Sequence, residues 1–110
     1  MEIRLIDVEP MVDIAIRTQF SHYIFRITEP RARKGFLSGG RLGTKQHEAF
    51  LACTFRPTNF RTSGKLDQLE TGHRALFYLD GSSTHTLTTS VITELGFVAT
   101  QAAAGPAGDC

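Results

Sequence analysis

Apolar and polar residues alternate along much of this chain with the period of two that is typical of half-buried β-strands. The alternation is clearest in residues 12–17, which read VDIAIR, and it returns in residues 23–28, which read YIFRIT. Successive side chains of a strand point to opposite faces of a sheet, so each segment would bury one face and expose the other. We expect two strands here, joined by a turn at residues 18–21.

Further strands are predicted across the rest of the chain. Their residue types and spacing place them at 35–37, 41–43, 48–55, 74–79, 84–90 and 91–98. Ser38-Gly39-Gly40 is expected to be a tight turn, and Asp80-Gly81 is a strong hairpin signal. Residues 66–72 are expected to form one helical turn or an irregular lead-in.

Residues 48–55 are apolar on both faces of the predicted strand. Strict alternation puts Phe50, Ala52 and Thr54 on one face and the residues between them on the other. A strand without a polar face is typical of a position between two neighbours. We therefore expect this strand in the interior of a sheet.

Several short strands without a sustained helical period predict an all-β domain. We expect residues 1–98 to form a single small antiparallel β-barrel of the SH3 or OB type, with five to seven strands, partly or fully closed. Residues 99–110 contain alanine, glycine and proline but no bulky apolar residue. They are predicted to be a flexible C-terminal tail. A chain of 110 residues has room for one such domain.

The composition favours a soluble cytoplasmic protein without a membrane role. The first eight residues mix charged and apolar side chains, which is unlike a signal peptide. The longest apolar run, Ala49–Cys53, is far shorter than the roughly 20 residues that cross a bilayer. Two cysteines, Cys53 and Cys110, do not make a disulfide framework.

The charges of the chain are strongly segregated. Residues 26–65 carry nine basic residues against two acidic ones, a balance of +7, within a chain whose net charge is +1. The segments on either side are acidic. Such a concentration of positive charge attracts anions, and polyanions most of all.

Aromatic residues lie among these cations, and this combination is typical of surfaces that bind single-stranded nucleic acid. Phosphates need counter-charges, and every base has a face that stacks on an aromatic ring. The candidate ligand-binding residues are Arg31, Arg33, Lys34, Phe36, Arg41, Lys45, Phe60 and Arg61. The sequence predicts a non-enzymatic binding module whose basic face docks an anionic partner.

Two other kinds of partner fit the same charge pattern. An acidic face of another protein would bind the basic segment equally well. The basic segment of one copy could also pair with the acidic end of another and give a homo-oligomer. Both alternatives make the chain a protein-interaction module with no role in binding nucleic acid.

Enzyme chemistry, metals and cofactors have no positive signal. Residues 38–45 resemble a phosphate-binding loop in composition, but the glycines have the wrong spacing and threonine precedes the lysine. The four histidines do not form the close ligand pairs that structural zinc sites show. The serines near Asp80 and His85 lack a nucleophile elbow. We expect no catalytic residue, no metal and no cofactor.

Overall fold

The computed structural model describes residues 1–56 and 67–98 of the protein. In this part of the chain the regular structure consists of strands and 3₁₀ turns. The strands are β1 (Glu2–Arg4), β2 (Val12–Thr18), β3 (His22–Glu29), β4 (Lys34–Gly39), β5 (His47–Phe55), β6 (Gln68–Glu70), β7 (Arg74–Leu79), β8 (Ser82–Thr88) and β9 (Ile92–Phe97). The 3₁₀ turns are η1 (Leu5–Asp7), η2 (Pro30–Ala32) and η3 (Gly40–Leu42). Phe60, Arg61 and the predicted tail lie outside the described residues.

Seven strands form one antiparallel sheet in the order β8-β7-β5-β4-β3-β2-β9, and β1 pairs with β6 in a second sheet. The prediction of an all-β, antiparallel fold is therefore confirmed. The strands expected at 12–17, 23–28, 48–55, 74–79, 84–90 and 91–98 all occur, each within two residues of its predicted bounds. In the strand order of the large sheet, β8 and β9 are the two edge strands. The two sheets together contain nine strands in the described residues, which is more than the five to seven expected.

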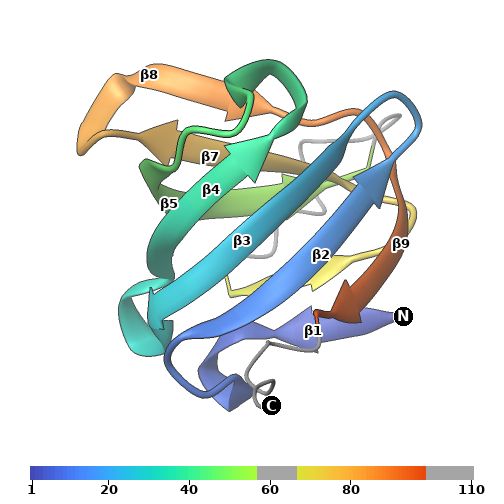
Figure 1. The fold of residues 1–110 in the computed structure, drawn as a ribbon. Coiled ribbons are helices and arrows are strands. Elements are labelled where there is room, and N and C mark those ends of the chain that lie inside the picture. The colour runs from blue at the N-terminus through green and yellow to red at the C-terminus, as the bar shows by residue number, and fades with distance from the viewer. Residues whose placement is uncertain (57–66, 99–110) are drawn as a thin grey trace, which may run out of the picture.

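The large sheet curls around its core, so that β2, β3 and β4 lie in front of β5 and β7 in Figure 1. Phe25 of β3 and Phe77 of β7 are fully buried, and their rings meet edge to face with centroids 5.1 Å apart. These strands are not neighbours in the sheet, since β4 and β5 lie between them. The alternating apolar residues of the sequence therefore line one concave face, and their neighbours form the convex outer face.

The small sheet closes one end of this core. β1 and β6 pair through Ile3 and Leu69, which are both buried, and Leu5 of η1 follows with no exposed surface. The expectation of a helical turn or irregular lead-in at 66–72 is wrong for residues 68–70, which form β6. Its partner strand lies more than sixty residues earlier, so local sequence carries no sign of the pairing.

The segment after β4 also differs from the prediction. Residues 41–43 were expected to pair with 35–37, but residues 40–42 form η3. Gly39 and Gly43 have φ angles of 99° and 71°, and the Gly39 amide donates to the Gly43 carbonyl at 2.7 Å. Only glycine adopts such angles at little cost, so the chain turns tightly here and does not form a second strand.

A β-bulge in β5 decides which of its residues face outward. The register with β7 shifts between Leu51 and Cys53, so one extra residue lies in β5. Beyond the bulge Thr54 turns inward and is fully buried, whereas Phe55 turns to the same outer face as Phe50. The prediction that Phe50 and Thr54 share a face is wrong because an inserted residue reverses the alternation of side chains. The predicted interior position of β5 is confirmed, since β4 and β7 flank it.

Candidate functional site

The predicted basic residues lie at two ends of β4. Arg31, Arg33 and Lys34 belong to η2 and the start of the strand, whereas Arg41 and Lys45 follow its other end. In Figure 1 these two ends are the turn at the lower left and the turn at the top of the sheet. With a rise of about 3.3 Å per residue, the six residues of β4 separate the two groups by roughly 17 Å. The cations therefore form two groups and not one continuous patch.

Arg26, the first cation of the basic segment, is neutralised within the protein. Its Nε and Nη2 donate to Oδ1 and Oδ2 of Asp13 at 2.7 and 3.2 Å, across neighbouring strands of the outer face. These hydrogen bonds and the carboxylate charge raise the pKa of Arg26 above its ordinary value. Elsewhere in the described ranges, Arg31, Lys34, Arg41 and Lys45 have no carboxylate within 4.0 Å. Charge available to a partner thus remains at both ends of β4.

The outer face of the sheet carries a stacked pair of aromatic rings beside the first group of cations. Phe50 of β5 and Tyr78 of β7 are register partners, with ring centroids 6.0 Å apart and planes inclined by 24°. Lys34 is the register partner of Phe50 on its other side. The guanidinium of Arg33 lies 4.8 Å from the centroid of the Phe50 ring. Cations and half-buried rings therefore meet at one place on the outer face.

Backbone conformation helps to place Arg33 there. Arg33 ends η2 with φ of 58°, and its amide donates to the Pro30 carbonyl at 3.1 Å. Pro30 favours the start of the turn because its own φ is fixed near the helical value. The left-handed residue then redirects the chain into β4, where Lys34 is the register partner of Phe50 and the Arg33 guanidinium lies over the Phe50 ring.

A second pairing of cation and ring lies further along the same face. The guanidinium of Arg74 lies 5.9 Å from the centroid of Phe55, its register partner on β5. The Arg74 Nε also donates to the Thr89 carbonyl at 2.8 Å, which holds the side chain against the sheet. By the strand rise, Phe55 lies roughly 15 Å from Phe50, with Cys53 between them. The outer surface of β5 and β7 thus carries an arginine beside an aromatic ring at two positions, Arg33 at Phe50 and Arg74 at Phe55. We call the surface between these two positions the track.

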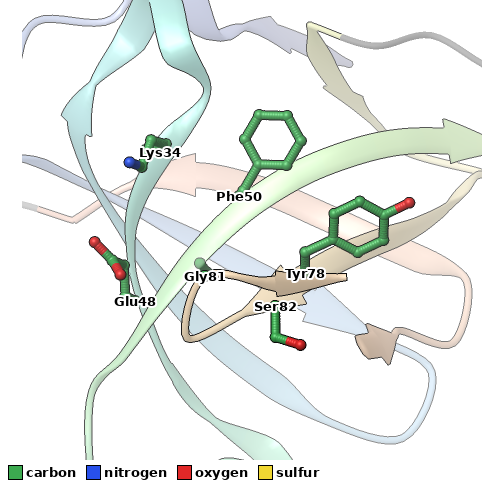
Figure 2. A pocket seen from close by; sticks show the side chains of 7 residues that line it. Lys34, Glu48, Phe50, Tyr78, Gly81 and Ser82 are labelled. Atoms are coloured by element: carbon green, nitrogen blue, oxygen red, sulfur yellow. The ribbon is translucent and has the colours of Figure 1, made fainter. Parts of the chain in front are cut away.

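A cavity of about 380 Å³ opens on this face beside the stacked rings (Figure 2). Its lining consists of Lys34, Glu48, Ala49, Phe50, Tyr78, Gly81 and Ser82. Figure 2 shows the two rings on one side, with Lys34 and Glu48 contributed by β4 and β5. The lining residues therefore combine flat aromatic rings with one ammonium group, one carboxylate and the two hydroxyls of Tyr78 and Ser82.

The hairpin between β7 and β8 supplies one wall of this cavity. Asp80 and Gly81 have φ angles of 55° and 72°, which confirms the predicted turn. The Asp80 amide donates to the Glu48 carbonyl at 2.7 Å, and the Asp80 carboxylate lies 3.5 Å from Nδ1 of His47. These contacts hold the turn against β5 and fix Gly81 and Ser82 at the cavity.

Within the described residues, His47 and Asp80 are a close pair of side chains, but no third metal-ligating side chain joins them. In residues 1–56 and 67–98, no three His, Cys, Asp or Glu side chains gather as a cation would require. His73 is buried near the Thr71 carbonyl, whereas His22 and His85 are exposed on β3 and β8. Burial raises the pKa of Cys53, which makes its thiol a poorer nucleophile.

Phe50 and Tyr78, the stacked aromatic residues of this face, are not among the ligand-binding residues predicted from the sequence. The sequence pattern places Phe50 and Tyr78 in strands without marking either as a ligand-binding residue, whereas Phe36 stands out through its basic neighbours. Phe36 does lie on the outer face, opposite Glu48, with 38% of its surface exposed. Strict alternation in β7 is a signal that could have placed Tyr78 on the outer face. Alternation does not place Phe55 on the outer face, because the bulge in β5 reverses the order of inward and outward side chains before it.

Comparisons with known proteins give no relative of this chain. No family model matches it, and no match is found among curated proteins or solved structures. A search of the described ranges for a helix with the length and apolar character of a membrane span also finds none. The site must therefore be interpreted from its own chemistry.

Proposed function

We propose that the protein is a non-enzymatic binding module that holds single-stranded nucleic acid on the outer face of β4, β5 and β7. The observation that carries this proposal is the stacked pair of Phe50 and Tyr78 with Arg33 and Lys34 beside it. A base stacked on an aromatic side chain contributes about 1–3 kcal/mol, whatever its identity. The adjacent cations would neutralise the phosphates that flank that base.

The arrangement of the face supports an extended ligand. The track from Phe50 to Phe55 provides two aromatic positions roughly 15 Å apart, and Arg74 lies at the second. Exposed Phe36 lies one strand away, beside the first position. Stacking tolerates any base, so we expect weak sequence preference and a strong dependence on salt.

We also propose that the curled sheet is a partly closed barrel. The Gly72 amide donates to the Ile92 carbonyl, and the Ile92 amide donates to the His73 carbonyl, both at 2.8 Å. These bonds join the chain just before β7 to the first residue of β9, near opposite edges of the large sheet. Such a link would stiffen the convex face on which the site lies.

Fluorescence anisotropy with a labelled ten-nucleotide single strand tests the function. We expect binding at 50 mM KCl that weakens as salt is raised. Lys34→Gln should weaken binding and reduce the salt slope by about 0.7 for each phosphate that is no longer neutralised. Lys45→Gln removes the same charge from the far end of β4 and is the matched control. Absence of binding at low salt, or equal effects of the two substitutions, would refute the proposal.

A homo-oligomeric interaction module is the second candidate. Three apolar side chains are exposed where β2 begins and β9 ends, namely Met11, Phe97 and Val98, with 36–58% of their surfaces accessible. β9 is also an edge strand of the large sheet. Light scattering separates this candidate from the first, because it requires a wild-type mass above that of a monomer and a lower mass for Phe97→Ser.

A further inference from the structure

We propose that Glu48 makes the site select ribonucleotides, because its carboxylate accepts a hydrogen bond from the ribose 2′-hydroxyl of a nucleotide stacked at Phe50 and Tyr78. This inference rests on the proposed function and names the class of nucleic acid that the site takes. Only RNA carries this hydroxyl, which is the group that distinguishes it from DNA at a given site.

Glu48 lines the cavity, and its carboxylate has no partner among the residues that the structure describes. Its side chain has no hydrogen bond or ion pair within the parts of the chain that the structure describes, and it is exposed. An ionised carboxylate accepts hydrogen bonds and donates none. Beside a phosphate it would be repulsive. A nucleic acid that occupies this cavity therefore gains most if it presents a donor to Glu48.

The spacing of the lining residues matches the parts of one nucleotide. Glu48 and Phe50 are two residues apart on β5, so both point outward with about 7 Å between their positions. Lys34 lies across from Phe50 on β4. The cavity of about 380 Å³ is near the lower limit of small-molecule sites, roughly 300–1,000 Å³, which fits one nucleotide.

The ribose 2′-hydroxyl is the donor that lies near Glu48 whichever base is stacked, because covalent bonds fix the position of the sugar. A ribose joins the phosphate to the base, so it stays beside both when the base stacks on Phe50 and the phosphate approaches Lys34. Amino groups of adenine, cytosine or guanine are also donors, but they depend on which base is stacked. Stacking tolerates any base. The Glu48 carboxylate is therefore better matched to the 2′-hydroxyl, which every ribonucleotide carries, than to an amino group that only some bases have.

Binding of labelled rU8 and dU8 to the full chain tests the inference, because these strands differ in the 2′-hydroxyl alone and uracil has no amino group. We expect wild-type protein to bind rU8 about tenfold more tightly, as one hydrogen bond to a charged group predicts. In Glu48→Gln the preference should fall to about threefold or less. Binding of dU8 should also strengthen, because repulsion is removed. Glu94→Gln, at the opposite edge of the sheet, is the charge-matched control and should behave as wild type.

The outcomes separate this inference from the function beneath it. Equal binding of rU8 and dU8 by wild-type protein overturns the sugar preference and leaves nucleic-acid binding in place. A preference that survives in Glu48→Gln overturns the role of Glu48. If rC8 and dC8 bind equally well and both bind more tightly than rU8 and dU8, and if Glu48→Gln removes this difference, the carboxylate accepts from a base amino group. That result also overturns the proposed contact with the 2′-hydroxyl. Failure of all four strands to bind overturns the proposed function itself.

Discussion

The contact between Phe25 and Phe77 reports on the curl of the large sheet, and it can be tested with a double-mutant cycle. The two rings belong to β3 and β7, which are separated by two strands, and meet with an interplanar angle of 70°. They touch only because the sheet folds over on itself. The outer face that carries the candidate site takes its convex shape from the same curl.

The magnitude follows from the burial of both rings. Each phenylalanine has no exposed surface, and replacement by leucine removes three buried carbons. At about 0.8 kcal/mol for each buried carbon, each single substitution should lower the free energy of unfolding by roughly 2 kcal/mol. The edge-to-face geometry adds a coupling of about 0.5–1.5 kcal/mol between the two positions. Because either substitution alone already removes this coupling, the double variant should be less destabilised than the sum of the single variants.

Urea denaturation of the wild type, Phe25→Leu, Phe77→Leu and the double variant measures these quantities. A total stability of about 5–15 kcal/mol is usual for a domain of this size, so all four proteins should fold. Changes in the midpoint at constant slope give the free energies. Additive losses, within about 0.3 kcal/mol, would mean that the two rings do not touch. That result would refute the conclusion that the sheet curls far enough to bring β3 and β7 into contact.

Two further predictions concern single sites. A Cβ on Gly35 would lie 1.9 Å from the Arg26 carbonyl oxygen, so Gly35→Ala should cost at least about 2 kcal/mol in urea denaturation. Gly96→Ala, where a Cβ meets nothing within 4 Å, should change stability by less than about 1 kcal/mol; equal losses at the two glycines would contradict this. Because burial raises the pKa of Cys53, its alkylation in a Cys110→Ser background should have a pH midpoint above that of an unburied thiol. A midpoint at or below that value would show that the thiol is not desolvated.

The location of the site shows where prediction from local sequence stops. Arg33, Lys34 and Phe36 stand out through their charges and neighbours, and they do lie around the outer face. Phe50 and Tyr78 do not stand out, because the choice between core and surface depends on the register of pairing strands. Sequence proximity also suggests one basic patch, but β4 carries Arg41 away from Arg31 by the length of a strand.

The sequence by itself determined the all-β class, the bounds of most strands and the Asp80-Gly81 turn, because these depend on interactions between residues close in the chain. Tertiary structure alone decided the pairing of β1 with β6, the curl that brings Phe25 to Phe77, and the bulge that turns Phe55 outward. Each of these depends on contacts between segments far apart in the chain. The stacked rings, their cations and the carboxylate of Glu48 come together for the same reason.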